Sequence, residues 1–414
     1  MHPSIRLAHE TLWSRFFCDE ENLFYDLEFT DSSQFPTREE VAASIPNSAG
    51  WCTGMEDCCL AGGWILDGLL CAHRVSGEHE WAEKARKVFK GLVALGTVSK
   101  TPGFIARAFA PGRRDIYPNS STDQYTSFVY GMWRYANSPV ASTEERETAT
   151  RLVLNATRLV ESFGDDIPRE DMRPSLYGET GLIEPDRACR LLQFYKAANV
   201  LSGDDHWHDV YMRKVEEHDR ARIRKHYGPE PFPPEHHMWA VFQSQAAWRL
   251  LFETEADSEL RGAYREALNA QAVCAMPVID TWREIVKQPL QRIIPDRWRD
   301  FYEPFCLEHP EIDMQADEAS GRFMEYMARH AEDIPPRPEA LARTRPTMPT
   351  LLEQVQAVGV GMLAEDPELK REAAEKGWPM FSEVDWSLMS ESAAVRCLEG
   401  AYWRGVEAGL FPAG

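Results

Sequence analysis

Amphipathic helical periodicity recurs along almost the whole chain and is the feature that most constrains its fold. From Trp81 to Leu95, apolar residues fall at the i, i+4, i+7 and i+8 spacing of a helix with one apolar face. The segments Arg190–Leu201 and Trp239–Phe252 repeat this pattern. Similar periodicity marks the segments 5–26, 57–75, 122–137, 143–163, 205–226, 257–272, 349–364 and 391–408. We therefore expect about eleven or twelve helices and few strands.

Helix start and stop signals separate these segments. Ser76-Gly77 is typical of a helix end. Ser142 with Glu145 has the spacing of a capping box that would start another helix, further along the chain. The resulting order is helix, short turn, helix, long loop. This order predicts an all-α toroid of helical hairpins rather than a solenoid, because a solenoid would show a fixed sequence period.

The segments between the helices predict where loops and domain edges lie. Residues 99–120 are expected to form a short hairpin or a long functional loop, and residues 165–187 a second long loop. Residues 273–348 are rich in proline and are expected to form a lid or a subdomain edge. No clean boundary divides the chain, so residues 1–414 are predicted to form a single catalytic domain.

The charge balance argues against nucleic acid as a partner. The 414 residues include 45 Lys and Arg against 66 Asp and Glu, which gives a net charge of −21. An acidic surface repels phosphate backbones, whereas a local group of arginines can still attract a small anionic substrate. The sequence holds no GxGxxG, P-loop, GxSxG or HExxH motif, so the common nucleotide-binding, serine-hydrolase and zinc-protease readings lose support.

Compartment and membrane signals are weak. The nine cysteines include no CxxC pair, which favours reduced core thiols and a cytoplasmic location over a disulfide framework. No signal peptide follows Met1; a periplasmic or secreted location remains open if a leader was removed. No apolar run was expected to reach the roughly 18 residues of a membrane span, so no membrane association is predicted. The oligomeric state is not predicted.

The segment 46–63 is the first candidate for chemistry. It is rich in glycine, contains Trp51, and places the acidic pair Glu56-Asp57 at the start of an apolar helix. Two carboxylates at a helix start can simply complement its dipole. In the functional interpretation, the glycine-rich loop places a carboxylate at the mouth of the ring.

The segment 103–135 is the second candidate. Arg107 and Arg113 precede the run Ser120-Ser121-Thr122-Asp123-Gln124-Tyr125. Ser or Thr ahead of Asp is also the pattern of an ordinary helix N-cap. In the functional interpretation, Asp123 points into a cavity beside Gln124 and Tyr125, where a partly desolvated carboxyl group can serve as a proton donor.

Further candidates lie on later segments. Tyr177 begins a loop that also carries Glu179, Glu184 and Asp186, which are equally consistent with solvated carboxylates. His236 and His237 precede a helix and could hydrogen-bond a sugar hydroxyl or carboxylate. No set of ligands has the spacing of a metal site, so neither a metal nor another cofactor is predicted.

At Gly54-Met55-Glu56-Asp57…Gly62-Gly63 and at Ser120–Tyr125, the chain resembles the six-hairpin glycosidase superfamily. The resemblance is nearest to its uronate-processing families: unsaturated glucuronyl hydrolases, unsaturated rhamnogalacturonyl hydrolases and exo-acting β-glucuronidases. It implies an (α/α)6 toroid and a carbohydrate substrate. It also implies that Asp123 protonates the leaving group and activates water, with Asp57, slightly preferred over Glu56, as the second acidic residue.

Charge and position alone suggest that Arg107 or Arg113 binds a uronate carboxylate. Tyr125, Trp51 and Trp133 are candidate stacking surfaces, and Trp133 is equally suited to the core. The sequence thus favours a glycoside hydrolase acting on a uronate-containing glycan by carboxylate acid/base catalysis.

Two alternatives from other classes remain open. A polysaccharide lyase on the same toroid would need a base and a group that neutralises the carboxylate, and Tyr125 or Tyr177 with His236 could supply them. A non-catalytic toroid that binds a glycan or a protein partner would need none of the candidate carboxylates.

Overall fold

Helices dominate the computed structural model, which describes residues 1–28, 34–228, 237–287, 298–330, 351–389 and 391–413. Within these residues the regular strands are β1 (Phe17–Cys18) and β2 (Leu23–Phe24), which pair antiparallel with Phe17 opposite Phe24. The predicted all-α class is confirmed.

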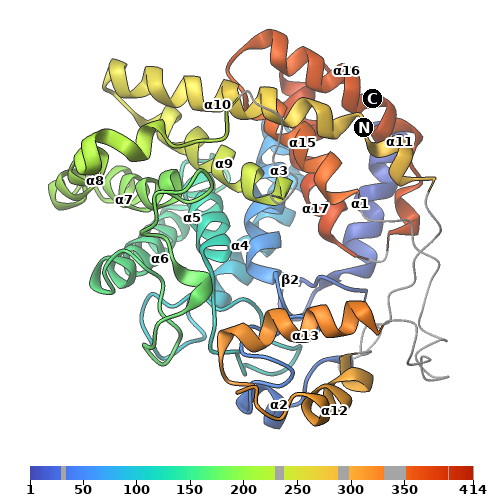
Figure 1. The fold of residues 1–414 in the computed structure, drawn as a ribbon. Coiled ribbons are helices and arrows are strands. Elements are labelled where there is room, and N and C mark those ends of the chain that lie inside the picture. Colours follow the sequence, from blue (N-terminus) through green and yellow to red (C-terminus); the bar gives the residue numbers. More distant parts are fainter. Residues whose placement is uncertain (29–33, 229–236, 288–297, 331–350, 390, 414) are drawn as a thin grey trace.

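Six helices form an inner ring in the described part of the chain (Figure 1). Each packs against the next in sequence order, and the last packs back against the first, which closes the ring. They are α3 (Cys58–Ser76), α5 (Thr122–Ala136), α7 (Ala188–Ser202), α9 (Met238–Thr254), α15 (Leu352–Leu363) and α17 (Ala393–Glu407).

Six further helices pack outside this ring. Each contacts one or two inner helices, as α4 contacts α3 and α6 contacts α5 and α7. The outer helices are α1 (Pro3–Arg15), α4 (His79–Leu95), α6 (Thr143–Ser162), α8 (Asp205–Arg224), α10 (Ser258–Ile279) and α16 (Pro367–Glu383). Alternation of inner and outer helices along the chain gives the predicted (α/α)6 toroid.

The composition of α3 explains its place in the inner ring. Its residues Cys58–Ala72 are all buried, because an inner helix is covered both by its ring neighbours and by an outer helix. By length and composition alone, Cys58–Ser76 could also cross a membrane, so the expectation of no such apolar run was wrong for this helix. In the ring, 83% of its apolar window is buried, which is the environment of a core helix.

Glycines let α3 and α5 approach closely. A Cβ atom added at Gly63 would lie 2.3 Å from the backbone oxygen of Ser127, and one at Gly131 would lie 2.9 Å from the Cα of Gly63. Neither helix could therefore keep this separation with a larger residue at these positions. The contact fixes the spacing of the two helices whose N-terminal ends carry Asp57 and Asp123.

Most predicted helix ends are confirmed. The capping box of Ser142 and Glu145 starts α6, and Gly77 adopts the left-handed conformation that ends α3. The helix predicted over residues 5–26 was wrong beyond Arg15, where the chain turns into the β1–β2 hairpin. Helix α16 had no predicted counterpart, because charged residues cover much of it.

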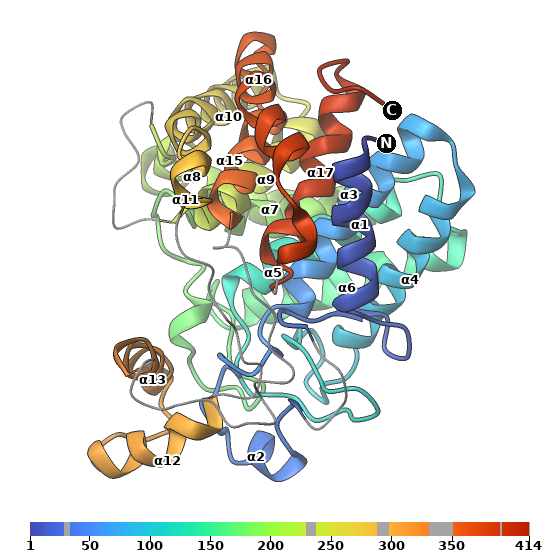
Figure 2. The same cartoon turned by 90° about the vertical axis from the view of Figure 1, so that its right-hand side faces the viewer.

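The segment between α10 and α15 holds a second, smaller unit. In its described part are α11 (Trp282–Ile285), α12 (Trp298–Glu308) and α13 (Asp317–Arg329). The last two pack through an apolar cluster separate from the main core: Trp298, Phe301, Phe305, Phe323 and Tyr326. Figure 2 shows α12 and α13 beside α2 (Arg38–Ala42), at the end of the ring where the long loops gather. The proline run 335–338 lies outside the described residues.

Candidate active site

The N-terminal ends of the six inner helices meet at one pocket of about 320 Å³. Helix N-termini carry a partial positive charge, so this geometry favours negatively charged groups inside the pocket. Side chains from all six inner helices or their preceding loops line it: Trp51, Glu56, Asp57, Leu60, Arg107, Ser121, Thr122, Asp123, Leu176, Tyr177, Asp186, Arg187, Arg190, Trp239, Gln243, Leu352, Gln356 and Arg396.

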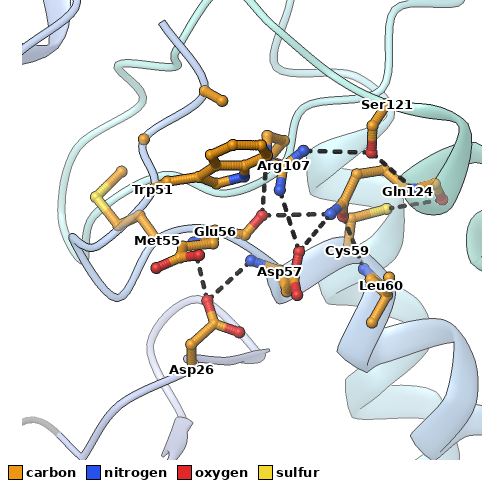
Figure 3. A network of polar contacts seen from close by, with 12 residues as sticks. Asp26, Trp51, Met55, Glu56, Asp57, Cys59, Leu60, Arg107, Ser121 and Gln124 are labelled. Atoms are coloured by element: carbon orange, nitrogen blue, oxygen red, sulfur yellow. Dashed lines mark hydrogen bonds and ion pairs between the residues drawn. The ribbon is translucent and has the colours of Figure 1, made fainter. Parts of the chain in front are cut away.

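Asp57 is held at the start of α3 by Arg107 and Gln124, which Figure 3 shows, and by Arg396 of α17. Its Oδ1 accepts from Arg107 Nη2 at 3.2 Å and from Gln124 Nε2 at 2.8 Å. Its Oδ2 accepts from Arg396 Nη2 at 3.2 Å. Asp57 stands at the N-cap position, which agrees with a charge that complements the helix dipole, although its side chain makes no capping hydrogen bond.

Asp26 supports the acidic pair from below in Figure 3. Its Oδ2 accepts from the backbone N–H groups of Glu56 and Asp57, each at 2.8 Å. Burial and the nearby Asp57 raise the pKa of Asp26 to about 6, while Arg396 acts in the opposite direction. Burial, with the charges of Asp26 and Asp57, raises the pKa of Glu56 to about 8. This shift favours the protonated form of Glu56.

Asp123 lines the same pocket from the first turn of α5. The N-cap of that helix is Ser121, whose side chain accepts from the backbone N–H of Gln124, so the N-cap pattern and the pocket position coexist. Asp123 Oδ1 accepts from Arg190 Nη1 at 2.6 Å. Arg190 is almost fully buried, and this contact orients the carboxyl group of Asp123.

Aromatic rings form one wall of the pocket. The ring centroids of Trp51 and Tyr177 lie 4.8 Å apart, and the guanidinium carbon of Arg107 lies 6.0 Å from the Trp51 ring centroid. Trp239, at the start of α9, also lines the pocket. Such rings can stack on the apolar face of a sugar.

Arg107 lines the pocket, but its hydrogen-bond donors contact other groups of the protein. Its Nε donates to the Glu56 carbonyl at 2.8 Å and its Nη1 to Ser121 Oγ at 3.2 Å, in addition to the contact with Asp57. Gln124 is fully buried, and its amide donates to Asp57 and to the Glu56 carbonyl. Both residues therefore position the acidic pair, and the expectation that Gln124 contacts substrate is not supported by its location.

Other predicted substrate residues lie elsewhere. Tyr125 is fully buried and its hydroxyl donates to the Gly103 carbonyl at 2.8 Å. Arg113 donates to the Pro36 carbonyl at 2.6 Å, and neither residue lines the pocket. His237 is exposed, 3.2 Å from Glu353, and also lies outside the pocket lining. His236 lies outside the described residues.

The remaining candidates divide between the pocket and its surroundings. Trp133 is buried away from the pocket, as its core interpretation predicted. Asp186 lines the pocket, whereas Glu179 pairs with Arg187 at 3.1 Å beside it.

Sequence reasoning missed several polar residues at the ring's centre. Arg190, Gln243, Gln356 and Arg396 lie within the first turns of apolar inner helices, and all four are buried. The Oε1 atoms of Gln243 and Gln356 have no hydrogen-bond partner among the described residues. The sequence did offer a signal for these site residues: a charged or amide residue near the start of an otherwise apolar helix. Such a group is buried only where a partner or ligand compensates for its lost hydration.

Among the residues that the structure describes, no cluster of three or more His, Cys, Asp or Glu side chains has metal-binding geometry. All nine cysteines are unpaired, and seven of them are buried, as expected for core thiols.

Comparisons with known proteins were made at the levels of sequence and fold. No protein-family model matches the sequence, and no curated protein matches it. A sugar epimerase from a ruminal bacterium aligns with 99% of this chain and 100% of its own, at 10% identity and a TM-score of 0.48. Cellobiose 2-epimerase from Bacillus thermoamylovorans aligns with 79% of this chain and 87% of its own, at 11% identity and a TM-score of 0.36. At these TM-scores the likenesses carry no argument about activity.

Proposed function

We propose that this protein is a carbohydrate-processing enzyme that hydrolyses a glycosidic bond next to a uronic acid. One observation carries the proposal: Asp57 and Asp123, from two neighbouring inner helices, line a single pocket together with aromatic rings and arginines. Paired carboxyl groups are the usual requirement of glycoside hydrolysis, and aromatic rings with polar donors are the usual surroundings of a bound sugar.

The acidic residues of the pocket differ in their surroundings. Asp57 accepts hydrogen bonds from two guanidinium groups, which hold its carboxyl group in place. Glu56, with its pKa raised to about 8 by burial and by nearby carboxylates, holds a proton. Asp123 faces them from α5 and is the candidate that the family resemblance favours.

In the proposed reaction, Asp123 donates a proton to the glycosidic oxygen as the bond to the anomeric carbon breaks. A water molecule then adds to that carbon and gives one proton to the Asp57 carboxylate. Glu56 is the alternative to Asp57 as the partner of Asp123; because burial favours its protonated form, Glu56 would then donate the proton and Asp123 would accept the proton from water. Arg190 orients Asp123 in this scheme, and Arg107, Gln124 and Arg396 orient Asp57.

Positive charge supports an anionic substrate. Arg113, one of the two arginines expected to bind a uronate, lies outside the pocket, and the donors of Arg107 are engaged by protein groups. Arg187 lines the pocket and pairs with Glu179 at 3.1 Å and Asp186 at 3.6 Å, but 29% of its side chain is exposed, so it is the more accessible guanidinium. We therefore assign the uronate carboxylate to Arg187, assisted by the inner-helix N-termini.

The candidate bases favour hydrolysis over a lyase reaction. The hydroxyl of Tyr125 is buried against Gly103, and that of Tyr177 donates to the backbone oxygen of Asp317. Neither hydroxyl is placed to remove a proton from a sugar carbon. The arrangement of carboxylates around an enclosed pocket also favours an enzyme over a non-catalytic glycan-binding toroid.

The test is incubation with saturated and unsaturated uronate-terminated oligosaccharides, followed by mass analysis and ultraviolet absorbance. Hydrolysis is expected to release a monosaccharide with one water added. Asp123→Asn removes the carboxylate that pairs with the buried Arg190, so its folded fraction is measured beside its kinetics, and its turnover per folded molecule should fall by about 10²-fold or more. Asp209→Asn on the exposed face of α8 should match the wild type. An unsaturated product from a saturated glycan would indicate a lyase, and an isomer of unchanged mass would indicate an epimerase. Full activity in Asp123→Asn would overturn its assignment.

A further inference from the structure

A buried carboxylate joins the α12–α13 unit to the ring. Asp317 is the first residue of α13 and is 8% exposed. A carboxylate in such a place is stable only where donors replace its water shell. Its donors come from three loops at the mouth of the pocket.

Two of these loops contact Asp317 Oδ1. Ser48 Oγ donates to it at 3.2 Å and Asn119 Nδ2 at 2.5 Å. Asn119 also donates to Ser48 Oγ at 2.7 Å, so the two loops are joined to each other at the same point. Ser48 precedes Trp51 on the first loop, and Asn119 directly precedes the N-cap region of α5.

The third loop contacts both oxygens and the backbone of Asp317. Arg169 Nη1 donates to Oδ1 at 3.3 Å, and the Leu176 N–H donates to Oδ2 at 2.8 Å. The Tyr177 hydroxyl donates to the Asp317 carbonyl at 2.5 Å. Leu176 and Tyr177 belong to the short helix η2 (Leu176–Gly178), and both line the pocket.

The aromatic wall therefore depends on Asp317. Tyr177 packs against Trp51, and each lies on a loop that Asp317 holds. The carboxyl groups of Asp57 and Asp123 are held without Asp317. Asp57 contacts Arg107, Arg396 and Gln124, and Asp123 contacts Arg190. Asp317 itself does not line the pocket.

We propose that Asp317 is a positioning residue that sets the aromatic wall of the sugar pocket without touching substrate. The effect of Asp317 on KM rests on the proposed function. Its effect on the loops rests on the loop contacts alone. Through Asp317, the α12–α13 unit then contributes to substrate affinity.

The test is Asp317→Asn, which keeps the shape and removes the charge. The new amide would place its N–H group against hydrogen-bond donors that now contact a carboxylate oxygen, and it would remove the nearer of the two carboxylates that pair with the buried Arg169. We expect faster hydrogen exchange at Leu176–Gly178 and in the Ser48–Trp51 loop. We expect KM to rise about tenfold while kcat changes less than about threefold, because the carboxylates keep their own partners.

The control is Glu318→Gln, which removes the same charge from the next, exposed residue of α13. It should leave exchange, KM and kcat at wild-type values. A defect in folding alone would lower kcat with the folded fraction and leave KM unchanged, which would overturn the inference. Wild-type exchange at Leu176–Gly178 in Asp317→Asn would overturn it as well. If the wild type turns over none of the glycans, the proposed function fails, and the exchange measurement still decides whether Asp317 holds the loops.

Discussion

The carboxylates of the pocket differ in what surrounds them, and this difference separates their roles. Asp57 contacts two guanidinium groups, whereas Glu56 accepts one hydrogen bond, from the backbone N–H of Cys52 at 2.6 Å. Burial and the nearby carboxylates raise the pKa of Glu56, so two acidic residues adjacent in sequence stand in different electrostatic surroundings.

Glu56 predicts a pH dependence of stability. Its folded pKa of about 8 lies above the ordinary value of 4.5, so the folded protein retains a proton that the unfolded chain releases. The contribution of Glu56 is fully present below pH 4.5 and is lost as pH rises through about 8. We expect the free energy of unfolding to fall across this window in the wild type and to fall less in Glu56→Gln. Chemical denaturation at several pH values measures both slopes.

The exposed Glu10→Gln is the matched control and should keep the wild-type slope. An identical slope in Glu56→Gln and the wild type would show that Glu56 is ionised in the folded protein at neutral pH. Glu56 would then lose its place as a proton-holding partner in the pocket.

At the scale of helices, close packing between inner elements sets the geometry of the site. The approach of α3 and α5 at Gly63 and Gly131 determines how far Asp57 stands from Asp123. Helix-period patterning selects which face of each helix is buried, but it does not specify how near two buried faces come. Small residues at the contact specify how near the two faces come.

Gly63→Ala tests this contact. The added Cβ would meet the Ser127 backbone oxygen at 2.3 Å, so the helices must separate. We expect a loss of about 2 kcal/mol in the free energy of unfolding, together with reduced turnover, measured by urea denaturation and kinetics on the same sample.

Gly262→Ala on α10 is the control, because nothing lies within 4 Å of the added Cβ. It should be neutral or stabilising by up to about 1 kcal/mol. Equal effects from the two substitutions would mean that the glycine contact does not set the helix spacing.

For the molecule as a whole, closing the ring creates two different ends. The N-terminal ends of the inner helices surround the pocket, and a layer of ion pairs lies near the opposite ends. There Asp67 of α3 contacts Arg134 of α5 at 2.9 Å and Arg404 of α17 at 2.6 Å. Arg134 also contacts Glu253 of α9 at 3.1 Å. Arginines at helix C-termini complement the negative ends of the helix dipoles.

Asp67→Asn is expected to destabilise the ring without changing the pocket. It removes the carboxylate that pairs with Arg404 and leaves Arg134 with Glu253 alone, which costs about 3 kcal/mol. Asp67 lies ten residues beyond Asp57, or about 15 Å along the helix, so KM should be unchanged. Thermal or urea unfolding and steady-state kinetics measure the two effects.

Glu83→Gln, which breaks the exposed pair with Arg86, is the control and should change stability by less than about 1 kcal/mol. If Asp67→Asn is as stable as the wild type, the ion-pair layer does not stabilise the closed ring. A changed KM would show that the two ends of the ring are coupled.

Local patterns were sufficient for most of the elements. The periodic segments at Trp81–Leu95 and Trp239–Phe252 and the capping box at Ser142 all correspond to helices of the structure. The helix predicted over residues 5–26 continued too far because the apolar β1–β2 hairpin has no clear strand period at two residues per strand. Helix α16 was missed because its charged residues hide the apolar side that packs on α15.

The sequence by itself determined the helical class, the hairpin order and the acidic residues at the starts of α3 and α5, because each depends on neighbouring residues. Only the tertiary structure decided that Asp57, Asp123, Arg190 and Arg396 share one pocket and that Tyr125, Arg113 and His237 do not. Residues from all six inner helices meet only when the ring closes. Burial and charge compensation at that junction depend on contacts far apart in the chain, which no local pattern encodes.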